Sequence, residues 1–183
     1  FRHLETPETI LGTEVVSADG KSLGKFYLDE NRTPIKFKDL PKHLVDALIA
    51  TEDERFYEHS GIDIRGTIRA MVYLGSKGGA STISQQLAKQ LFHKEKTRGI
   101  ARYPQKIKEW IIATRLEKQY TKEEILTMYF NIYDFNNNAD GIRSAAKIYF
   151  DKEPKQLKIE EGAMLVGMFK NSALYNPVKN KEG

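Results

Sequence analysis

From residue 41 onward, apolar residues recur at the spacing of amphipathic helices, and this pattern predicts seven helices. In the first, Leu44, Val45, Leu48 and Ile49 share one face, and Pro41 suits the first turn. The other six are expected at residues 63–75, 81–92, 104–120, 122–133, 140–150 and 159–170.

The N-terminal segment has a different pattern. Residues 13–28 place apolar residues on both sides of the pair Asp19-Gly20, which is a frequent turn of β-hairpins. The expected fold class is therefore mainly α with a small N-terminal β-hairpin. We expect residues 1–38 to form this hairpin and a linker, and residues 39–183 to form the main domain. We also expect the sequence to be a piece of a longer protein, cut within the main domain at its C-terminus.

Capping signals locate three of the helix starts. Asp63 is placed to cap the second helix. A capping box, in which Ser or Thr precedes Glu or Gln by three positions, is present at 82–85 and 121–124, so the third helix should start near Ser81. The fourth helix is expected to be amphipathic through Ile107, Trp110, Ile111 and Thr114.

The composition excludes several classes of protein. The chain is 40% hydrophobic and 30% charged, with a formal net charge of +4, which is typical of a globular domain and permits an anionic partner without requiring one. The absence of cysteine excludes a disulfide framework and a thiolate metal site. No apolar run approaches the roughly 18 residues of a membrane span.

Glu52 is the candidate for acid–base chemistry. It follows Leu48 by four residues and precedes Phe56 by four, so on a continuous helix it interrupts an apolar face. A half-buried carboxylate there is suited to accept a proton. The alternatives are a structural ion pair and a helix that frays before Glu52. For His59, a structural role is favoured over metal binding, because the four histidines are scattered.

Residues 64–94 form a basic tract without a single Asp or Glu. At the mean frequency of acidic residues, about four would be expected on a mixed surface of this length. The basic residues are Arg65, Arg69, Lys77, Lys89 and Lys94. The third helix lies in this tract, and we expect it to bury Ile83, Leu87 and Leu91 and to expose Gln85, Gln86 and Lys89.

The start of this third helix has the chemistry of an anion site. Two preceding glycines let the backbone approach a ligand closely, and the free N–H groups and dipole of a helix N-terminus favour an anion. Hydroxyl, amide and ammonium groups add donors. A phosphate or pyrophosphate, beside a sugar, fits this set, although the spacing is not that of a Walker A loop. A glycine hinge before an ordinary polar helix is the alternative.

A second basic cluster precedes Glu109. Its members are Lys94, Lys96, Arg98, Arg102, Lys106 and Lys108. An anionic membrane surface or a second phosphate is the expected partner. Nucleic acid is not expected, because no nucleic-acid-binding module is recognisable.

Taken together, these stretches resemble the peptidoglycan glycosyltransferases, which occur as monofunctional enzymes and as one half of class A penicillin-binding proteins. The first of five family motifs is matched by Glu52, Asp53, Phe56, His59, Gly61 and Asp63. The others are matched, in order, by residues 78–90, 105–109, 122–131 and 141–150. The resemblance covers roughly residues 40–178.

The departures from the family motifs are few. Ser84 stands for the usual Thr, Gln90 for Asn and Phe130 for Leu. Gln105 stands for an Arg, which removes one fixed positive charge. Either Arg98 or Arg102 is expected to replace that charge.

The resemblance implies a lysozyme-like, two-lobed helical domain whose smaller lobe touches a membrane surface. It implies a location on the extracytoplasmic face of the bacterial cytoplasmic membrane, with an N-terminal transmembrane anchor ahead of Phe1. A transpeptidase domain is a possible further partner after Gly183 in the parent chain.

The resemblance also implies a reaction, the polymerisation of lipid II into glycan strands. Glu52 would be the general base, and undecaprenyl pyrophosphate would leave with inversion at the donor carbon. Glu109, the second catalytic candidate, would orient basic groups or the donor. The substrate-binding residues implied are Asp53, Phe56, Arg69, Ser81, Thr82, Gln85, Gln86, Lys89, Lys106 and Lys108. No cofactor or dedicated metal site is expected, although Mg or Mn ions would stimulate the reaction.

Two other functions remain open at this level. A lysozyme-like hydrolase or lytic transglycosylase would share the fold and a catalytic Glu, but the acid-free tract argues against it. A non-catalytic basic module at the membrane surface would bind lipid without needing Glu52.

Overall fold

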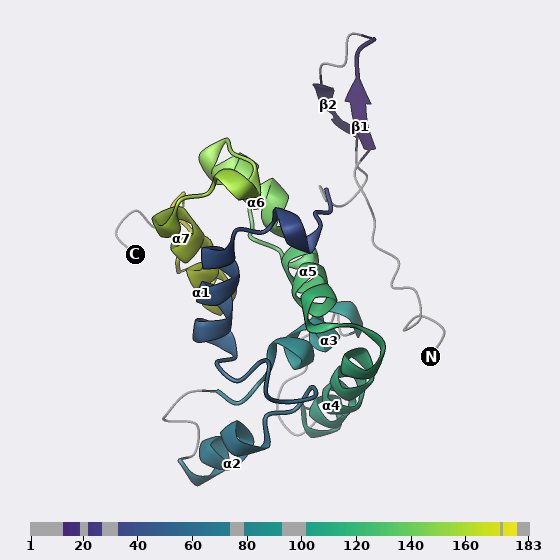
Figure 1. Cartoon of the computed structure of the whole chain (residues 1–183), viewed down its shortest axis with the longest axis vertical. Helices are drawn as coiled ribbons and strands as arrows, with labels where there is room; N and C mark the ends of the chain where they lie inside the picture. Colours follow the sequence, from purple (N-terminus) through teal and green to yellow (C-terminus); the bar gives the residue numbers. More distant parts are fainter. Residues whose placement is uncertain are drawn as a thin grey trace. The chain divides into compact units, whose positions relative to one another are not determined.

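The computed structural model describes residues 13–18, 22–26, 33–73, 79–92, 102–172 and 174–178. Helices dominate this part of the chain, which confirms the mainly α class (Figure 1). The α-helices are α1 (Lys42–Glu52), α2 (Ile64–Val72), α3 (Ile83–Phe92), α4 (Arg102–Gln119), α5 (Lys122–Ile132), α6 (Gly141–Phe150) and α7 (Ile159–Lys170). Two 3₁₀ helices are η2 (Phe37–Asp39) and η4 (Pro154–Gln156). Over these ranges, no helix has the length and hydropathy that a membrane crossing requires.

The predicted hairpin is confirmed. Strands β1 (Thr13–Val16) and β2 (Ser22–Phe26) pair antiparallel, with Thr13 opposite Phe26 and an irregularity between Val15 and Val16. The predicted turn residues Asp19 and Gly20 lie outside the described residues.

The chain divides into two compact units, and one of them is made of two segments that are separate in the sequence. One unit comprises Phe1–Ala47 with Phe130–Gly183, and the other comprises Leu48–Tyr129. The expected separation of residues 1–38 from residues 39–183 stays a prediction.

Aromatic side chains fill the core of the first unit. The Tyr133 ring lies 4.9 Å from that of Phe135 and 4.2 Å from that of Phe169, centroid to centroid. Phe130 packs edge-on against Phe169 at 5.6 Å. The Tyr133 hydroxyl donates to the carbonyl oxygens of Met168 and Phe169, so its polar end is satisfied inside the core.

The second unit is built on the packing of α3 against α4. Leu87 and Ala88 of α3 are fully buried, as are Ala113 and Leu116 of α4. Gly61, in the loop before α2, has φ +93°, and a Cβ there would lie 2.8 Å from the Ala113 carbonyl carbon. Only glycine fits this close approach, which fixes the loop against α4.

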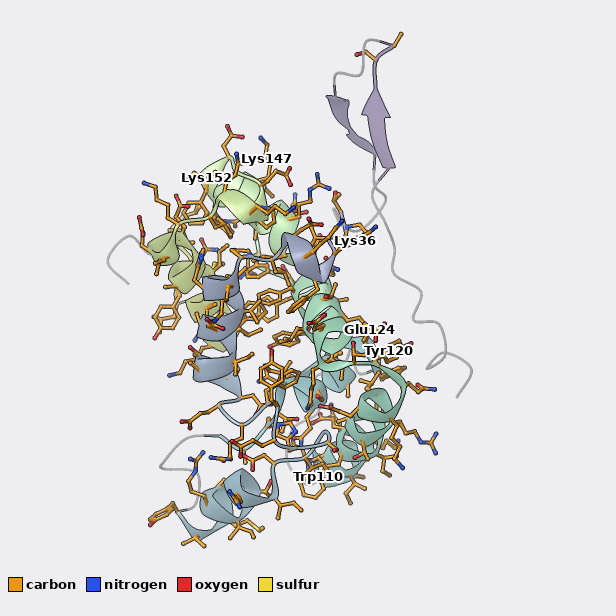
Figure 2. All side chains as sticks on the ribbon, in the orientation of Figure 1. Lys36, Trp110, Tyr120, Glu124, Lys147 and Lys152 are labelled. Carbon is orange, nitrogen blue, oxygen red and sulfur yellow. The ribbon has the colours of Figure 1, made fainter. Side chains whose placement is uncertain are left out.

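Two of the three predicted caps are confirmed. The Asp63 side chain accepts the Gly66 N–H at 3.0 Å. At the start of α5, the Glu124 carboxylate accepts the Thr121 N–H at 2.7 Å, and the Thr121 hydroxyl accepts the Glu124 N–H at 3.2 Å, which is a complete capping box (Glu124 is labelled in Figure 2).

The predicted capping box of α3 is only half present. The Thr82 hydroxyl accepts the Gln85 N–H at 3.1 Å, but the helix begins at Ile83 rather than near Ser81. The Gln85 amide donates to the Gly61 carbonyl oxygen at 3.3 Å instead of closing the box. Gln85 is therefore buried, at 1% exposed, and the prediction that it lies on the exposed face was wrong.

The buried face of α4 also differs from the prediction. Ile107 and Ile111 are 57% and 50% exposed, whereas Gln105 and Glu109 are buried. The polar pair is tolerated inside because its groups find protein partners, such as Lys106 for Glu109. A pattern that scores only apolar residues therefore assigns α4 the wrong face.

Candidate functional site

Glu52 ends α1 and is linked to α3 and α5 by a chain of two hydrogen bonds. The Gln86 Nε2 donates to Glu52 Oε2 at 2.8 Å, and the Tyr129 hydroxyl donates to Gln86 Oε1 at 2.7 Å. Glu52 is half-buried, while Tyr129 is fully buried. The helix continues to Glu52, so the alternative in which it frays earlier is wrong.

The direction of this chain follows from its chemistry. An ionised carboxylate only accepts hydrogen bonds, so Gln86 must turn its NH₂ group toward Glu52 and its oxygen toward Tyr129. Among the described residues, Glu52 receives this donor on Oε2 alone, and Oε1 remains available to accept a proton from a ligand. The second N–H of Gln86 also has no partner there.

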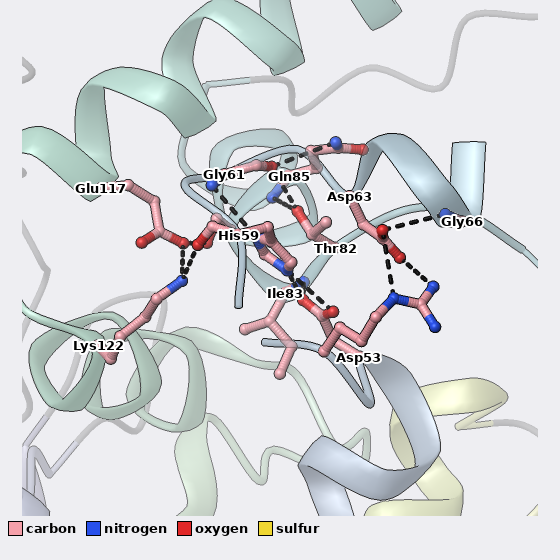
Figure 3. A network of polar contacts seen from close by, with 12 residues as sticks. Asp53, His59, Gly61, Asp63, Gly66, Thr82, Ile83, Gln85, Glu117 and Lys122 are labelled. Carbon is pink, nitrogen blue, oxygen red and sulfur yellow. Dashed lines mark hydrogen bonds and ion pairs between the residues drawn. The ribbon is translucent and has the colours of Figure 1, made fainter. Parts of the chain in front are cut away.

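Asp53, the neighbouring acid, is engaged by the protein on both oxygens. It is 7% exposed, and its carboxylate lies 3.0 Å from His59 Nε2. It also accepts the N–H of Ile83, the first residue of α3, at 3.0 Å (Figure 3). Because the Gly61 N–H donates to His59 Nδ1, the proton of the neutral ring lies on Nε2, facing Asp53. These contacts agree with the structural role favoured for His59.

Thr82 and Gln85 converge on the carbonyl oxygen of Gly61, at 2.7 and 3.3 Å (Figure 3). Both side chains are 1% exposed, and Phe56 is fully buried. In this arrangement the three side chains secure the loop before α2 and the start of α3. Their predicted contacts with substrate stay predictions.

Glu109 and Ser81 meet at Lys106. The Lys106 ammonium donates to Ser81 Oγ at 2.8 Å and to Glu109 Oε2 at 3.0 Å. Glu109 is 6% exposed, while Lys106 is half-buried. A buried carboxylate therefore orients an accessible cation at the start of α3.

Lys122 connects α5 to the same loop, and the sequence reasoning did not single it out. Its ammonium donates to the His59 carbonyl oxygen and to Glu117 Oε1, both at 2.7 Å (Figure 3). It also lies 4.3 Å from the centre of the Phe56 ring. Ser84 Oγ donates to the same Glu117 oxygen at 2.6 Å. The contacts bind the loop of residues 53–63 to α3, α4 and α5.

An ion pair closes the other end of this loop. Arg55 Nη2 lies 2.5 Å from Asp63 Oδ2. Burial opposes ionisation of Asp63, but the hydrogen bonds from Arg55 and the Gly66 N–H outweigh it, so the pKa of Asp63 is lowered. Beside this pair lies a cavity of about 510 Å³, lined by Arg55, Glu58, His59, Ser60, Ile62, Asp63, Ile64, Arg65 and Thr114.

The remaining predicted phosphate-binding residues are exposed. Arg69, Lys89 and Lys108 extend from α2, α3 and α4, and within the described part of the chain no carboxylate pairs with them. No contact there joins them to Glu52 or Glu109. The structure thus provides three accessible cations in addition to Lys106.

The residues considered as replacements for the missing arginine are not described. Arg98 lies outside the described residues, and of Arg102 only the backbone in α4 is described. Gln105 itself is buried, at 9% exposed, and has a partner. Within the described ranges, no group of three or more His, Asp or Glu side chains is arranged to hold a metal ion.

The structure thus brings the predicted residues together in three groups: Glu52 with Gln86, Asp53 with the start of α3, and Glu109 with Lys106 and Ser81. Sequence reasoning missed Tyr129, Lys122 and Glu117 as supports of these groups. The apolar periodicity of α5 could have placed Tyr129 on the buried face, but not its partner.

Comparisons with known proteins agree on one family. A family model described as Transglycosylase matches residues 19–183. The chain is 41% identical over 179 residues to penicillin-binding protein 1F of Bacillus subtilis, and the matched region covers 93% of this chain and 24% of that protein. It is 42% identical over 173 residues to penicillin-binding protein 1A of Neisseria lactamica, covering 92% and 21%. The chain spans about a quarter or less of the length of the curated relatives it matches.

Proposed function

Because the chain belongs to the transglycosylase family, and is thus a glycosyltransferase domain with a lysozyme-like helical fold, we propose that it polymerises lipid II into peptidoglycan glycan strands. The observation that carries this proposal is Glu52, a half-buried carboxylate with one oxygen fixed by Gln86 and the other without a partner among the described residues. A peptidoglycan glycosyltransferase needs such a group to activate a sugar hydroxyl.

Glu52 acts as the general base. Its Oε1 accepts the proton of the acceptor sugar 4-hydroxyl as that oxygen attacks the donor anomeric carbon. A new carbon–oxygen bond forms, the bond to the pyrophosphate oxygen breaks, and the leaving group takes the electron pair with inversion at the carbon. Proton transfer to a positioned base contributes about 10² to 10⁴ in rate.

The basic residues stabilise the departing undecaprenyl pyrophosphate. Lys106 is held in place by Glu109 and Ser81 before the reaction. A cation that is already oriented stabilises the negative charge that develops on the leaving group. The exposed side chains of Arg69, Lys89 and Lys108, which pair with no carboxylate among the described residues, supply further cations. Glu109 serves the reaction by orienting Lys106, since its carboxylate is buried against that ammonium.

The surface of α2 favours a membrane partner. Along one face of this nine-residue helix, four apolar side chains are 53–69% exposed, with arginines beside them. Apolar and basic residues together suit the interface of an anionic bilayer. The apolar residues are Ile64, Ile68, Met71 and Val72, and the arginines are Arg65 and Arg69.

The setting of the parent protein is part of the proposal. We place the domain on the extracytoplasmic face of the cytoplasmic membrane, held by an N-terminal anchor, with a transpeptidase domain in the same parent chain. The relatives named penicillin-binding protein 1A and 1F, of which this chain covers 24% or less, support a further domain in the parent chain. Mg or Mn ions are proposed to stimulate the reaction without being bound in a dedicated site, which chelation by EDTA would test.

Incubation of the purified chain with lipid II in detergent tests the function. Glycan polymer on a gel is the expected product, and shortening of added glycan strands would instead favour a cleaving enzyme. Lipid binding by the Glu52→Gln variant, with no polymer from the wild type, would favour a non-catalytic membrane module.

A further inference from the structure

We propose that Tyr129 is a positioning residue for the general base, acting on Glu52 through Gln86. This inference rests on the proposed function, because it assigns Tyr129 a part in the proton transfer at Glu52. The supporting geometry is the chain of hydrogen bonds from the Tyr129 hydroxyl to Gln86 Oε1, 2.7 Å, and from Gln86 Nε2 to Glu52 Oε2, 2.8 Å.

The two ends of this chain differ in rigidity. Tyr129 lies in the middle of α5 and is fully buried, so packing holds its ring and hydroxyl in place. Gln86 is half-buried and Glu52 is the last residue of α1, so both side chains have more rotational freedom. Because the tyrosine is the most firmly packed of the three, it anchors the position of the amide, while the ionised carboxylate decides which end of the amide faces Glu52.

Orientation of the Gln86 amide decides how it meets Glu52. With its oxygen held by the Tyr129 hydroxyl, the amide presents N–H to the carboxylate. Without that hydroxyl, the amide oxygen loses its hydrogen-bond donor, and the side chain is free to leave the position from which its N–H meets Glu52. Tyr129 therefore anchors the amide in the position from which its N–H aligns the Glu52 carboxylate.

The same chain can adjust when Glu52 takes up the proton. A protonated carboxyl donates a hydrogen bond, which the Gln86 oxygen accepts after the amide turns. The Tyr129 hydroxyl, both donor and acceptor, can then accept from the turned NH₂ group. A phenylalanine at position 129 fills the same space but has no hydroxyl, so it can neither donate to the Gln86 oxygen when Glu52 is ionised nor accept from the Gln86 NH₂ group when Glu52 is protonated.

The test is a double-mutant cycle on the full chain with lipid II. Tyr129→Phe should lower kcat about three- to tenfold with KM nearly unchanged, the range expected for loss of one neutral hydrogen bond. Gln86→Ala should lower kcat further, and the double variant should match Gln86→Ala alone. Additive losses, or an unchanged kcat in Tyr129→Phe, would overturn the proposal.

A matched control separates positioning from stability. Tyr133→Phe removes the hydroxyl of a half-buried tyrosine, which donates to the Met168 and Phe169 carbonyl oxygens. It should lower the free energy of unfolding about as much as Tyr129→Phe does, but leave kcat unchanged. An equal fall in kcat in both variants would mean that tyrosine hydroxyls act only through the fold.

A spectroscopic readout is independent of turnover. The side-chain NH₂ signals of Gln86, identified by their absence in Gln86→Ala, should move and broaden in ¹⁵N NMR spectra of Tyr129→Phe but not of Tyr133→Phe. Unmoved signals in Tyr129→Phe would refute the positioning role even if the chain makes no polymer. If the Gln86 signals move in Tyr129→Phe but the Glu52→Gln variant still polymerises lipid II, the positioning role stands and only the assignment of Glu52 as the base is refuted.

Discussion

Gln86 of α3 donates a hydrogen bond from its side-chain amide to Glu52 at the end of α1, with 2.8 Å between Nε2 and Oε2. One carboxylate oxygen is thereby fixed by the protein, and the other has no hydrogen-bond partner among the described residues. Glu52 and Gln86 belong to two separate sequence motifs, and the hydrogen bond joins them in one site.

Replacing the amide by a carboxyl group should disable this pair. In Gln86→Glu, two carboxylates would lie within hydrogen-bond distance and share one proton, because both cannot ionise side by side. We expect kcat for lipid II polymerisation to fall at least about tenfold. The exposed Gln119→Glu on α4 is the matched control and should polymerise normally. Equal activity of the two variants would show that Gln86 does not face the working base.

Lys89 should matter for substrate and not for stability. It is exposed on α3, so Lys89→Ala should change the free energy of unfolding by less than about 0.5 kcal/mol. If it meets the pyrophosphate, donor KM should rise and kcat should fall. Lys118→Ala, on the exposed surface of α4, provides the comparison. A loss of stability without a kinetic defect would contradict the phosphate role.

Gly61 should be intolerant of a side chain. In Gly61→Ala, the Cβ would meet the Ala113 backbone at 2.8 Å in a residue with φ +93°. We expect the free energy of unfolding to fall by about 2 kcal/mol or more, measured by urea denaturation. Gly79→Ala is the control, because a Cβ there meets nothing within 4 Å. Similar stability of the two variants would argue against the close packing of this loop on α4.

Asp63 should link stability to acid pH. Burial opposes its ionisation, but Arg55 and the Gly66 N–H lower its pKa in the folded state, so its contribution is present at neutral pH and disappears as pH falls through the folded pKa. Asp63→Asn should therefore cost about 2 kcal/mol at pH 7 and progressively less at acid pH. Urea denaturation at neutral and at acid pH measures this difference. The exposed pair of Asp46 with Lys42 offers a control, since Asp46→Asn should cost less than about 1 kcal/mol at either pH.

Much of the fold could be predicted because local signals agree with it. The stripe of Leu44, Val45 and Leu48, the Asp63 cap and the box at Thr121 and Glu124 depend on neighbours in sequence, and all appear in the structure. The face of α4 and the burial of Gln85 could not, because they depend on polar partners distant in sequence.

The candidate site shows the same limit. Motifs identified Glu52, Gln86 and Glu109, but the hydrogen bond from Gln86 to Glu52 spans 34 positions and that from Tyr129 to Gln86 spans 43. Which polar groups meet across such separations depends on how helices pack. No local pattern carries that information, so the partners of Lys122 and Tyr129, two residues of the matched stretch 122–131, emerged only from the structure.

The most direct test of the account is lipid II polymerisation by the wild-type chain beside Glu52→Gln, with lipid II binding measured in parallel. The amide fills the same space and can still accept a hydrogen bond from Gln86, so the fold and binding should be kept. We predict glycan polymer from the wild type and a rate lower by about 10² to 10⁴ in the variant. Near-normal turnover by Glu52→Gln would contradict the assignment of Glu52 as the general base.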